Sequence, residues 1–229
     1  MAIGDIHGCL TALTTLVESI GLRDDDTVIT LGDYVNRGPD SKGVLDWLIE
    51  FQKTGQLLAL MGNHEVMLMN ARMDDVYRRQ LLGVGGKQTL ASYATESLVD
   101  PQMEDIPDQH WQFLDNHLHR FFEIDSHFFV HANAYSDTDL QDQPDHMLFW
   151  EKYNDPSFHV SGKIMVCGHS SQKCGLPVYN DASVCIDTWA HGDEGWLSCL
   201  DVVSRKVWQA NQLGETRNFY LDQIEAVSD

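Results

Sequence analysis

The side chains best suited to catalysis lie in five separated segments of the chain. The segments carry Asp5 and His7, then Asp33, then Asn63 and His64, then His131, and finally His169. Carboxylate oxygens, imidazole nitrogens and amide oxygens bind hard or borderline divalent metals, and they need no thiolate to do so. A carboxylate between two such ions can bridge them at a separation of about 3.5–4 Å. This set of donors therefore predicts a binuclear metal centre.

Each segment alone has a simpler interpretation. A lone histidine after a strand is more often a hydrogen-bonded structural residue than a ligand. The segment around Asp5 could be a turn, and Asn63 could cap the helix that follows it. The repetition argues against coincidence, because each segment follows a predicted strand beside a glycine or another small residue. The remaining histidines lack this context and are expected to be structural or surface groups: His110, His117, His119, His127, His146, His159 and His191.

Strand and helix signals alternate in the first third of the chain. Apolar runs predict strands at residues 1–3, 27–31 and 57–61, and amphipathic spacing predicts helices at 10–20 and 41–51. This order and the continuously apolar strands predict an α/β core with a sheet covered on both faces. Ligands of open α/β sheets bind beyond the carboxyl ends of the strands, so the polar segments can converge on one site.

The rest of the chain has a different pattern of predicted secondary structure. Residues 66–121 are expected to form a helical insertion that makes a wall or cap beside the core. The later part is expected to form a second sheet, packed on the first, from β-rich runs at 121–125, 127–131, 163–167, 183–187, 196–203 and 206–210. Since no repeat, low-complexity tract or linker divides the sequence, residues 1–229 are predicted to be a single domain.

The charge of the chain limits its partners. Lysine and arginine number 15 and aspartate and glutamate 35, a formal net charge of −20 with histidines neutral. Such a chain is repelled by nucleic-acid backbones and by anionic membrane surfaces, so we expect no general binding to either. A phosphate-binding site on this chain must create its own positive potential. Bound metal ions would supply it.

Cysteine usage favours a reducing compartment. The five cysteines are odd in number and form no Cys-x-x-Cys pair, a pattern typical of free thiols rather than of a disulfide framework or a zinc ribbon. No window approaches the roughly 18 uninterrupted apolar residues of a membrane-spanning helix. The first residues lack the basic and apolar regions of a secretory signal. The predicted location is the cytoplasm.

Taken together, the five segments resemble the phosphoprotein phosphatase family of calcineurin-like metallophosphoesterases. The matching motifs occur in the family's order: Gly4-Asp5-Ile6-His7-Gly8, Gly32-Asp33-Tyr34-Val35-Asn36-Arg37-Gly38, Gly62-Asn63-His64-Glu65, His131-Ala132 and Gly168-His169. The resemblance covers nearly the whole chain. It is strongest to small bacterial and phage-type members, which include lambda-type protein phosphatases and symmetrical diadenosine tetraphosphatases. It implies a four-layer α/β/β/α sandwich.

The resemblance also implies two metal-ligand sets that share Asp33. The first ion would be bound by Asp5, His7 and Asp33, and the second by Asp33, Asn63, His131 and His169. Members of the family commonly use manganese, and sometimes iron or zinc. The implied reaction is direct attack on phosphorus by a hydroxide that bridges the two metals, with no covalent phosphoenzyme.

Other motif positions are expected to contact the substrate. Arg37 would clamp the phosphoryl group through its planar fork, although a solvated loop charge is the simpler alternative. His64 would be the general acid that protonates the leaving oxygen. The complete set of expected phosphate-binding residues is Arg37, Asn63, His64 and Lys152.

The chain departs from the family pattern near the phosphate. Many protein phosphatases of this family have arginine where this chain has Met61, and they have a second clamping arginine between the two rear histidines. This chain has no arginine between Arg120 and Arg205. The nearest counterpart is Lys152, either as a point-charge substitute or as an ordinary solvated lysine.

A further departure is Asn36, where the family has an aspartate that pairs with the histidine acid. An aspartate orients the imidazole and favours its protonated form through its charge. Asn36 is expected to accept a hydrogen bond from His64 through its amide oxygen but to contribute no charge. We therefore expect impaired turnover of substrates whose leaving group needs a proton.

The predicted function is a two-metal phosphoesterase, in the first place a serine/threonine-type phosphoprotein phosphatase. The alternative is a dinucleoside polyphosphate hydrolase with the same fold, acting on substrates such as diadenosine tetraphosphate. A third hypothesis, ranked lower, is a catalytically weakened protein that mainly binds phosphorylated ligands because of Asn36.

Overall fold

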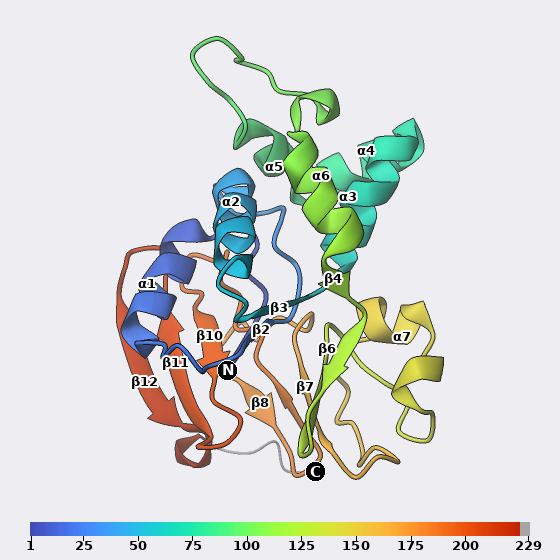
Figure 1. The fold of residues 1–229 in the computed structure, drawn as a ribbon, viewed down its shortest axis with the longest axis vertical. Coiled ribbons are helices and arrows are strands. Elements are labelled where there is room, and N and C mark those ends of the chain that lie inside the picture. Colours follow the sequence, from blue (N-terminus) through green and yellow to red (C-terminus); the bar gives the residue numbers. More distant parts are fainter. Residues whose placement is uncertain (225–229) are drawn as a thin grey trace.

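A computed structural model of the protein describes residues 1–224 and contains two β-sheets (Figure 1). The strands of the seven-stranded sheet are, in spatial order, β12 (Thr216–Tyr220), β11 (Lys206–Ala210), β10 (Leu197–Leu200), β1 (Ala2–Ile3), β2 (Val28–Thr30), β3 (Leu57–Leu60) and β4 (Leu118–His119). Those of the five-stranded sheet are β5 (Phe121–Glu123), β6 (His127–Val130), β7 (Ile164–Cys167), β9 (Ser183–Cys185) and β8 (Val178–Tyr179).

The centre of each sheet is parallel. Strands β1, β2, β3 and β4 run in the same direction in the first sheet, and β6, β7 and β9 do so in the second. The outer strands β10, β11, β12, β5 and β8 pair antiparallel. Parallel strands bring their carboxyl ends to one edge of the sheet, so the loops that follow them lie together.

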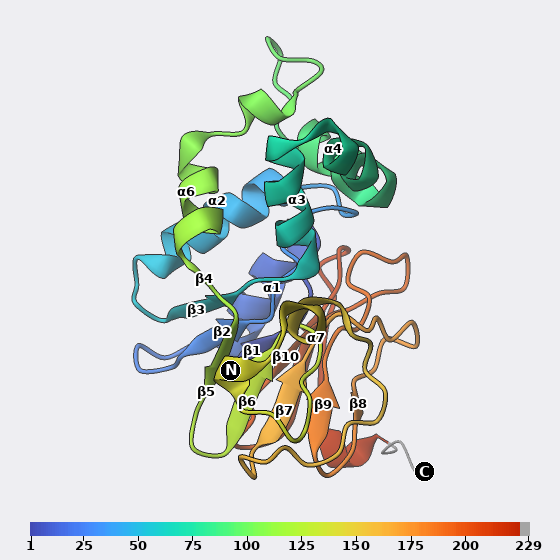
Figure 2. The same ribbon diagram turned by 90° about the vertical axis from the view of Figure 1, so that its right-hand side faces the viewer.

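Three apolar clusters separate four layers, which are visible in Figure 2. Between the sheets, Ile29 and Leu60 of the first pack in one cluster with Phe129 and Val184 of the second. The outer face of the first sheet is covered by α1 (Leu10–Ile20), α2 (Ser41–Gln52) and α6 (Asp108–Asn116). The outer face of the second sheet contacts α7 (Asp145–Trp150). This arrangement confirms the predicted α/β/β/α sandwich.

The segment predicted as a helical insertion is largely helical and rises above the sheets in Figure 1. It contains α3 (Asn63–Met73), α4 (Asp75–Leu81), a π turn at Leu82–Gly86, α5 (Lys87–Ala91), a 3₁₀ turn at Met103–Asp105, and α6. Helix α3 begins at Asn63, directly after the N-cap residue Gly62. Asn63 is therefore the first helical residue rather than the cap. The segment ends in β4, which the sequence pattern did not predict.

The assignment of all rear strands to one sheet was wrong. Strands β10 and β11 belong to the first sheet, where β10 pairs antiparallel with β1. The reason is that β1 is an interior strand, with β2 on one side and an open hydrogen-bonding edge on the other until β10 returns to fill it. Strands β8 and β12 and helix α7 were also missed.

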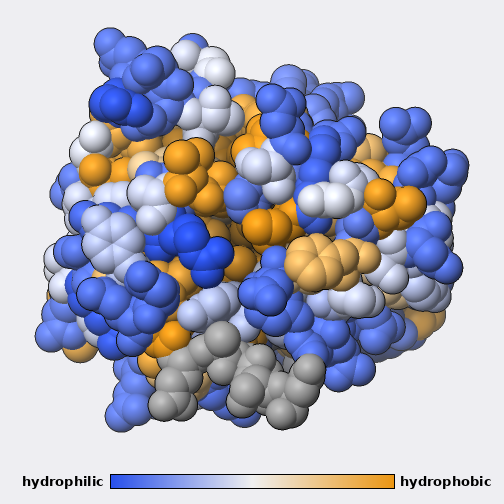
Figure 3. Space-filling model, turned by 90° about the horizontal axis from the view of Figure 1, so that it is seen from below, coloured by the Kyte–Doolittle hydropathy of each residue, from blue (hydrophilic) through white to orange (hydrophobic). Residues whose placement is uncertain are grey.

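The opposite end of the sandwich, at the amino ends of β1, β2 and β3, carries an apolar groove. Figure 3 shows apolar side chains in a furrow between polar ones on this face. The groove has a volume of about 680 Å³, and its lining includes Met1, Ile29, Leu58, Phe122 and Phe129. Within residues 1–224, none of the helices has both the length and the apolar character needed to cross a bilayer.

Candidate metal centre

Loops that follow the parallel strands converge above the carboxyl ends of both sheets. Several of their residues adopt the left-handed backbone region, which is unfavourable for residues other than glycine: His7, Asp33, Asn36, Arg37 and His169 have φ between 47° and 71°. Such conformations persist only where the surrounding structure enforces them, and they cluster at functional sites. Their concentration in three of these loops marks this end of the molecule as the candidate site.

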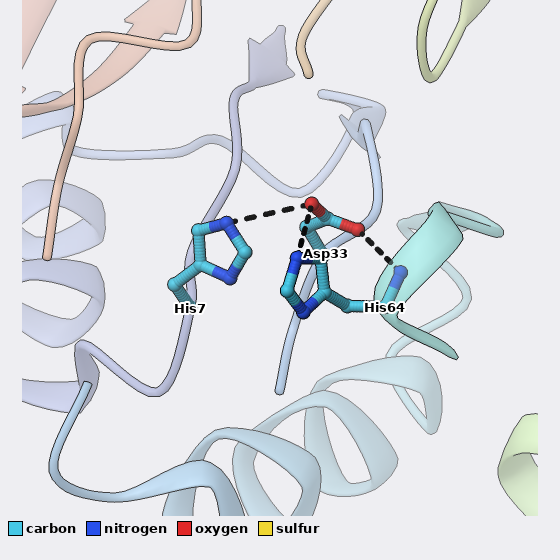
Figure 4. A group of neighbouring side chains, drawn as sticks. All are labelled: His7, Asp33 and His64. Carbon is cyan, nitrogen blue, oxygen red and sulfur yellow. Dashed lines mark hydrogen bonds and ion pairs between the residues drawn. The ribbon is translucent and has the colours of Figure 1, made fainter. Parts of the chain in front are cut away.

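Asp33 lies at the middle of the cluster and is 2% exposed. Its Oδ2 is 3.4 Å from Nε2 of His7 and 3.9 Å from Nε2 of His64, while its Oδ1 is 3.4 Å from Nε2 of His131. The backbone N–H of His64 also donates to Oδ1 at 3.0 Å. Figure 4 shows Asp33 beside His7, which comes from the loop after β1, and His64, which comes from the start of α3. The two oxygens of one carboxylate thus face two different groups of histidines.

Hydrogen bonds to the backbone orient three of the histidine rings. Nδ1 of His7 donates to the carbonyl of Val35 at 3.0 Å, and Nδ1 of His131 donates to that of Leu31 at 2.8 Å. Each of these rings presents Nε2 to the centre. His169 is reversed, because its Nε2 is 3.0 Å from the carbonyl of Trp150 and its Nδ1 faces the centre. Metal-binding histidines are typically oriented in this way through their second nitrogen.

Two groups of side chains bring their donor atoms close enough to hold an ion. They are His7, Asp33 and His64, and Asp33, His131 and His169, with Asp33 common to both. Asn63 adjoins the second group, since its Oδ1 is 3.0 Å from both His131 Nε2 and His169 Nδ1. Oxygen and imidazole donors in these groups fit borderline divalent ions. The donor set therefore suits the two metals implied by the motifs.

Asp5 lies beside these groups but belongs to neither. Both of its oxygens accept the backbone N–H of His169, at 3.1 and 3.0 Å. Burial raises the pKa of Asp5 well above its usual range, and the nearby carboxylates of Asp187 and Asp33 raise it further. A cation at the first group would offset the mutual repulsion of these buried carboxylates.

Burial alone would raise the pKa of Asp33, but three neighbouring imidazoles outweigh it. His131, His64 and His7 hold the pKa of this carboxyl below its usual range. Burial lowers the pKa of His7 well below its usual value, and it lowers that of His169 to about 3 with help from the charge of His131. Asp33 is thus ionised and the rings of His7 and His169 are unprotonated, which is the protonation state that metal binding requires.

Glu65 holds the loops of the first sheet together, a role that the sequence analysis did not assign. Its carboxylate accepts the backbone N–H groups of Asp33, Tyr34 and Gly62 at distances of 2.7–3.0 Å. Burial raises the pKa of Glu65 to about 8, against the lowering effect of these donors. The side chain is fully buried and joins the end of β2 to the start of α3. It fixes Asp33 relative to Asn63 and His64.

The contact between Asn36 and His64 differs from the prediction. Nδ2 of Asn36 lies 2.8 Å from Nδ1 of His64, so the amide donates to the ring instead of accepting from it. The amide oxygen accepts the hydroxyl of Thr89 at 2.7 Å. Thr89 Oγ1 also accepts the backbone N–H of Asn36, at 2.9 Å, which leaves its own proton free to donate. This network fixes the orientation of the amide and keeps Nδ1 of His64 unprotonated.

Arg37 and Lys152 lie at the open side of the centre. Arg37 is exposed, and its Nη1 donates to Nε2 of His7 at 2.9 Å. Lys152 is exposed as well, and its Nζ donates to the backbone carbonyl of His169 at 3.0 Å. Both charges contribute to lowering the pKa of His64, after burial. The expected phosphate-binding cations are thus near the centre, and each is hydrogen-bonded to a residue of one of the two metal groups.

Two further residues of the centre escaped the sequence analysis. Asp187 is 1% exposed and follows β9 by two residues, the same strand-end position that identified the other candidates. That signal could have found it. His191 was expected to be structural or on the surface, but its ring lies edge-on against His7 with centroids 4.9 Å apart. No strand ends next to His191, and only the folded loop brings it to the centre.

Comparison with known proteins identifies a family over most of the chain. The family described as calcineurin-like phosphoesterase matches residues 1–197. The symmetrical bis(5'-nucleosyl)-tetraphosphatase of Neisseria gonorrhoeae is 42% identical over 69 residues, which cover 30% of this chain and 24% of that protein. Serine/threonine-protein phosphatase 1 of Salmonella typhimurium is 39% identical over 71 residues, 31% of each protein. The chain thus aligns with less than a third of the length of either relative.

The fold has counterparts among solved structures. A serine/threonine phosphatase from Saccharomyces cerevisiae aligns with a TM-score of 0.61 and 14% identity, covering 98% of this chain and 79% of that one. At this level of identity the likeness concerns the fold alone. It agrees with the two-sheet architecture described above.

Proposed function

The chain belongs to the calcineurin-like phosphoesterase family, and from this premise we propose that it hydrolyses phosphoesters at a centre of two divalent metal ions. The observation that carries the proposal is the position of Asp33. Its two oxygens face separate histidine groups at 3.4 Å, so this one carboxylate could be shared by two ions. Within this proposal the metal ligands are Asp5, His7, Asp33, Asn63, His131 and His169. Manganese is the proposed native metal, with iron or zinc as alternatives.

The metals would supply an acidified water and positive charge against the phosphoryl oxygens. The chain's own residues would bind and orient the ester. Arg37, on the open side of His7, would pair with phosphoryl oxygens through its guanidinium and absorb charge that develops in the transition state. This requires Arg37 to exchange its bond to His7 Nε2 for bonds to the substrate.

His64 would hold the proton that the leaving oxygen takes. Its Nδ1 accepts from Asn36, so in the neutral ring the proton is on Nε2, which faces Asp33 at 3.9 Å. Burial, followed by the charge of Arg37, lowers the pKa of His64 and makes the doubly protonated ring scarce at neutral pH. The proposed enzyme therefore favours leaving groups that depart with little help from an acid.

The first candidate substrate is a serine/threonine phosphoprotein, in keeping with the motifs and with the named Salmonella relative. The second is a dinucleoside polyphosphate, and a pocket beside the centre favours it. This pocket has a volume of about 200 Å³ and is lined by Met67, Asn70, Tyr77, Gln80 and Trp150. Aromatic rings and amides of this kind can stack on a nucleobase and hydrogen-bond its edges. The carbonyl of Trp150 also accepts from His169.

The test is a direct comparison of substrates. Manganese-loaded protein is incubated with a phosphoserine peptide, with p-nitrophenyl phosphate and with diadenosine tetraphosphate, and kcat/KM is measured for each. The proposal expects metal-dependent hydrolysis of at least one, and the ranking of the peptide against the dinucleotide decides the substrate class. If manganese, iron and zinc all leave every substrate intact, the proposed activity is wrong and the protein is a phosphate-ligand binder at most.

A further inference from the structure

His191 has an unexplained polar atom at the edge of the centre. The side chain is half-buried, and its Nδ1 is buried with no hydrogen-bond partner among residues 1–224. A buried ring nitrogen without a partner costs free energy, so such an atom in a folded protein calls for a missing partner. The neighbouring rings are His7, at 4.9 Å between centroids, and Trp189, at 6.1 Å, both in edge-on geometry.

The loop that carries His191 is held in place from several sides. The N–H of Trp189 donates to Oδ1 of Asp187 at 3.1 Å, and Oδ2 of Asp187 accepts the hydroxyl of Ser171 at 2.7 Å. The hydroxyl of Thr188 lies 2.6 Å from that of Ser198 in β10. This loop therefore presents His191 from a fixed support, rather than from a solvated surface turn.

His191 adjoins the first metal group, because its ring packs edge-on against His7, a member of that group. The ring of His64 also packs edge-on against His7, with centroids 4.7 Å apart. Arg37 itself is bonded to Nε2 of His7 at 2.9 Å. Arg37, His64 and His191 thus all lie against His7, and the first two are residues proposed to act on the substrate.

The centre contains an arginine that can clamp a phosphoryl group, and a second clamping arginine is not evident from the sequence. A phosphoryl group in transfer has three equatorial oxygens, and two clamping groups orient it better than one. Arg37 can supply one clamp, but the sequence contains no arginine between Arg120 and Arg205. Lys152 is exposed and donates to the carbonyl of His169, on the side of the second metal group. His191 lies against His7 on the other side, that of the first metal group, where Arg37 is bonded.

We propose that His191 binds the substrate's phosphoryl group, with its Nδ1–H donating to a phosphoryl oxygen beside Arg37. It would thereby supply the second clamp that this chain lacks as an arginine. This inference rests on the proposed phosphoesterase function. A neutral imidazole suffices for the role, because the hydrogen bond needs only one N–H. The competing interpretation is that the ring merely packs against His7 and keeps that ligand in position.

Two substitutions separate these interpretations. His191→Phe keeps an aromatic ring against His7 and Trp189 but removes both nitrogens, whereas His191→Gln keeps an N–H donor without the ring. His146→Phe is the matched control, because His146 is exposed and contacts Tyr135 away from the centre. Each protein is loaded with manganese, its metal content is measured, and inorganic phosphate is titrated into it by calorimetry.

We expect His191→Phe to retain its manganese and to bind phosphate about tenfold more weakly, the usual effect of losing one hydrogen bond to a charged group. His191→Gln should recover part of that affinity, and His146→Phe should bind as the wild type does. Where a substrate is turned over, kcat/KM should fall in the same order as phosphate affinity.

Three results would overturn the inference: unchanged phosphate affinity in His191→Phe, a loss of manganese that accounts for any loss of phosphate, or no phosphate binding by the loaded wild type. The titration needs no turnover. The inference about His191 can therefore be tested independently of the proposed activity. The proposed activity is wrong if the wild type binds phosphate and manganese but hydrolyses none of the three test substrates.

Discussion

The carboxyl ends of β1, β2 and β3 carry buried aspartates and histidines, and their loops include residues in the left-handed backbone region. The amino ends of the same strands border a groove lined by Met1, Ile29 and Leu58, which faces Phe122 and Phe129 of the second sheet. The same three strands thus support a polar, strained end and an apolar end. Apolar burial stabilises the fold, whereas buried carboxylates and strained backbone oppose it.

This contrast means that residues for activity and residues for stability lie toward opposite ends of one strand, β2. Asp33 lies only three residues beyond the end of β2, and Ile29 is inside that strand. Changes at the polar end should act on metal binding and turnover, and changes at the apolar end should act on the free energy of unfolding. The predictions below test that separation, beginning with the largest expected effect.

Asp33→Asn should reduce hydrolysis by about a thousandfold or more. It removes the only side chain common to both candidate metal groups, and the charge that would hold two cations together. The measurement is kcat/KM with saturating manganese. Asp201→Asn is the control, since Asp201 borders the apolar groove at the other end. Comparable losses in the two variants would contradict the separation of the two ends.

Phe129→Ala should lower the free energy of unfolding by about 3–5 kcal/mol, because it empties space between the two sheets. Phe129 is 1% exposed and packs in the cluster that joins the sheets. Urea denaturation measures the loss. At temperatures where the variant remains folded, its manganese content should equal that of the wild type. A variant that folds normally but no longer binds manganese would show that the two ends are coupled.

A chelator should lower the melting temperature of the wild type by several degrees. Metal bound only to the folded state stabilises it, by about 2.7 kcal/mol when free metal is a hundredfold above the dissociation constant. The same treatment should have no effect on Asp33→Asn and its full effect on Phe129→Ala. Melting curves with and without the chelator give both comparisons, and an unshifted wild type would argue that the ions do not bind at this end.

Asn36→Asp should give the smallest change, about a tenfold gain in turnover of a phosphoserine peptide. The carboxylate would accept a hydrogen bond from Nδ1–H of His64 and favour the protonated ring, whereas the Asn36 amide donates to that nitrogen. A phenolate or a nucleoside phosphate leaves more readily than an alkoxide, so p-nitrophenyl phosphate should gain less. Equal gains with both substrates, or none, would show that Asn36 does not act through His64.

Local patterns in the sequence were enough to predict a covered first sheet, a second sheet packed on it and the residues that meet at the polar end, while the four layers were implied by the family resemblance. Asp33, Asn63, His131 and His169 all follow predicted strands, and parallel strands necessarily gather such residues at one edge. These patterns could not predict which distant segments pair as neighbouring strands. Whether β10 joins the first or the second sheet depends on the free edge of β1, nearly the whole chain away.

Side-chain orientation was the other part that the sequence could not provide. Asn36 was expected to accept from His64, and the reversal comes from Thr89, which belongs to a distant helix and occupies the amide oxygen. His191 was expected to be a structural or surface residue because it does not follow a predicted strand. Its place beside His7 results from the path of a loop anchored by Asp187 and Ser198, which no local pattern encodes.

The central claim is that the polar end holds two divalent ions through a shared Asp33. The most direct test is the metal content of desalted protein after incubation with excess manganese, measured by elemental analysis. The account predicts two ions per chain in the wild type and in Asp201→Asn, and a marked loss from both sites in Asp33→Asn. A wild-type protein that retains no transition metal, or an Asp33→Asn variant that still retains two ions, would contradict it.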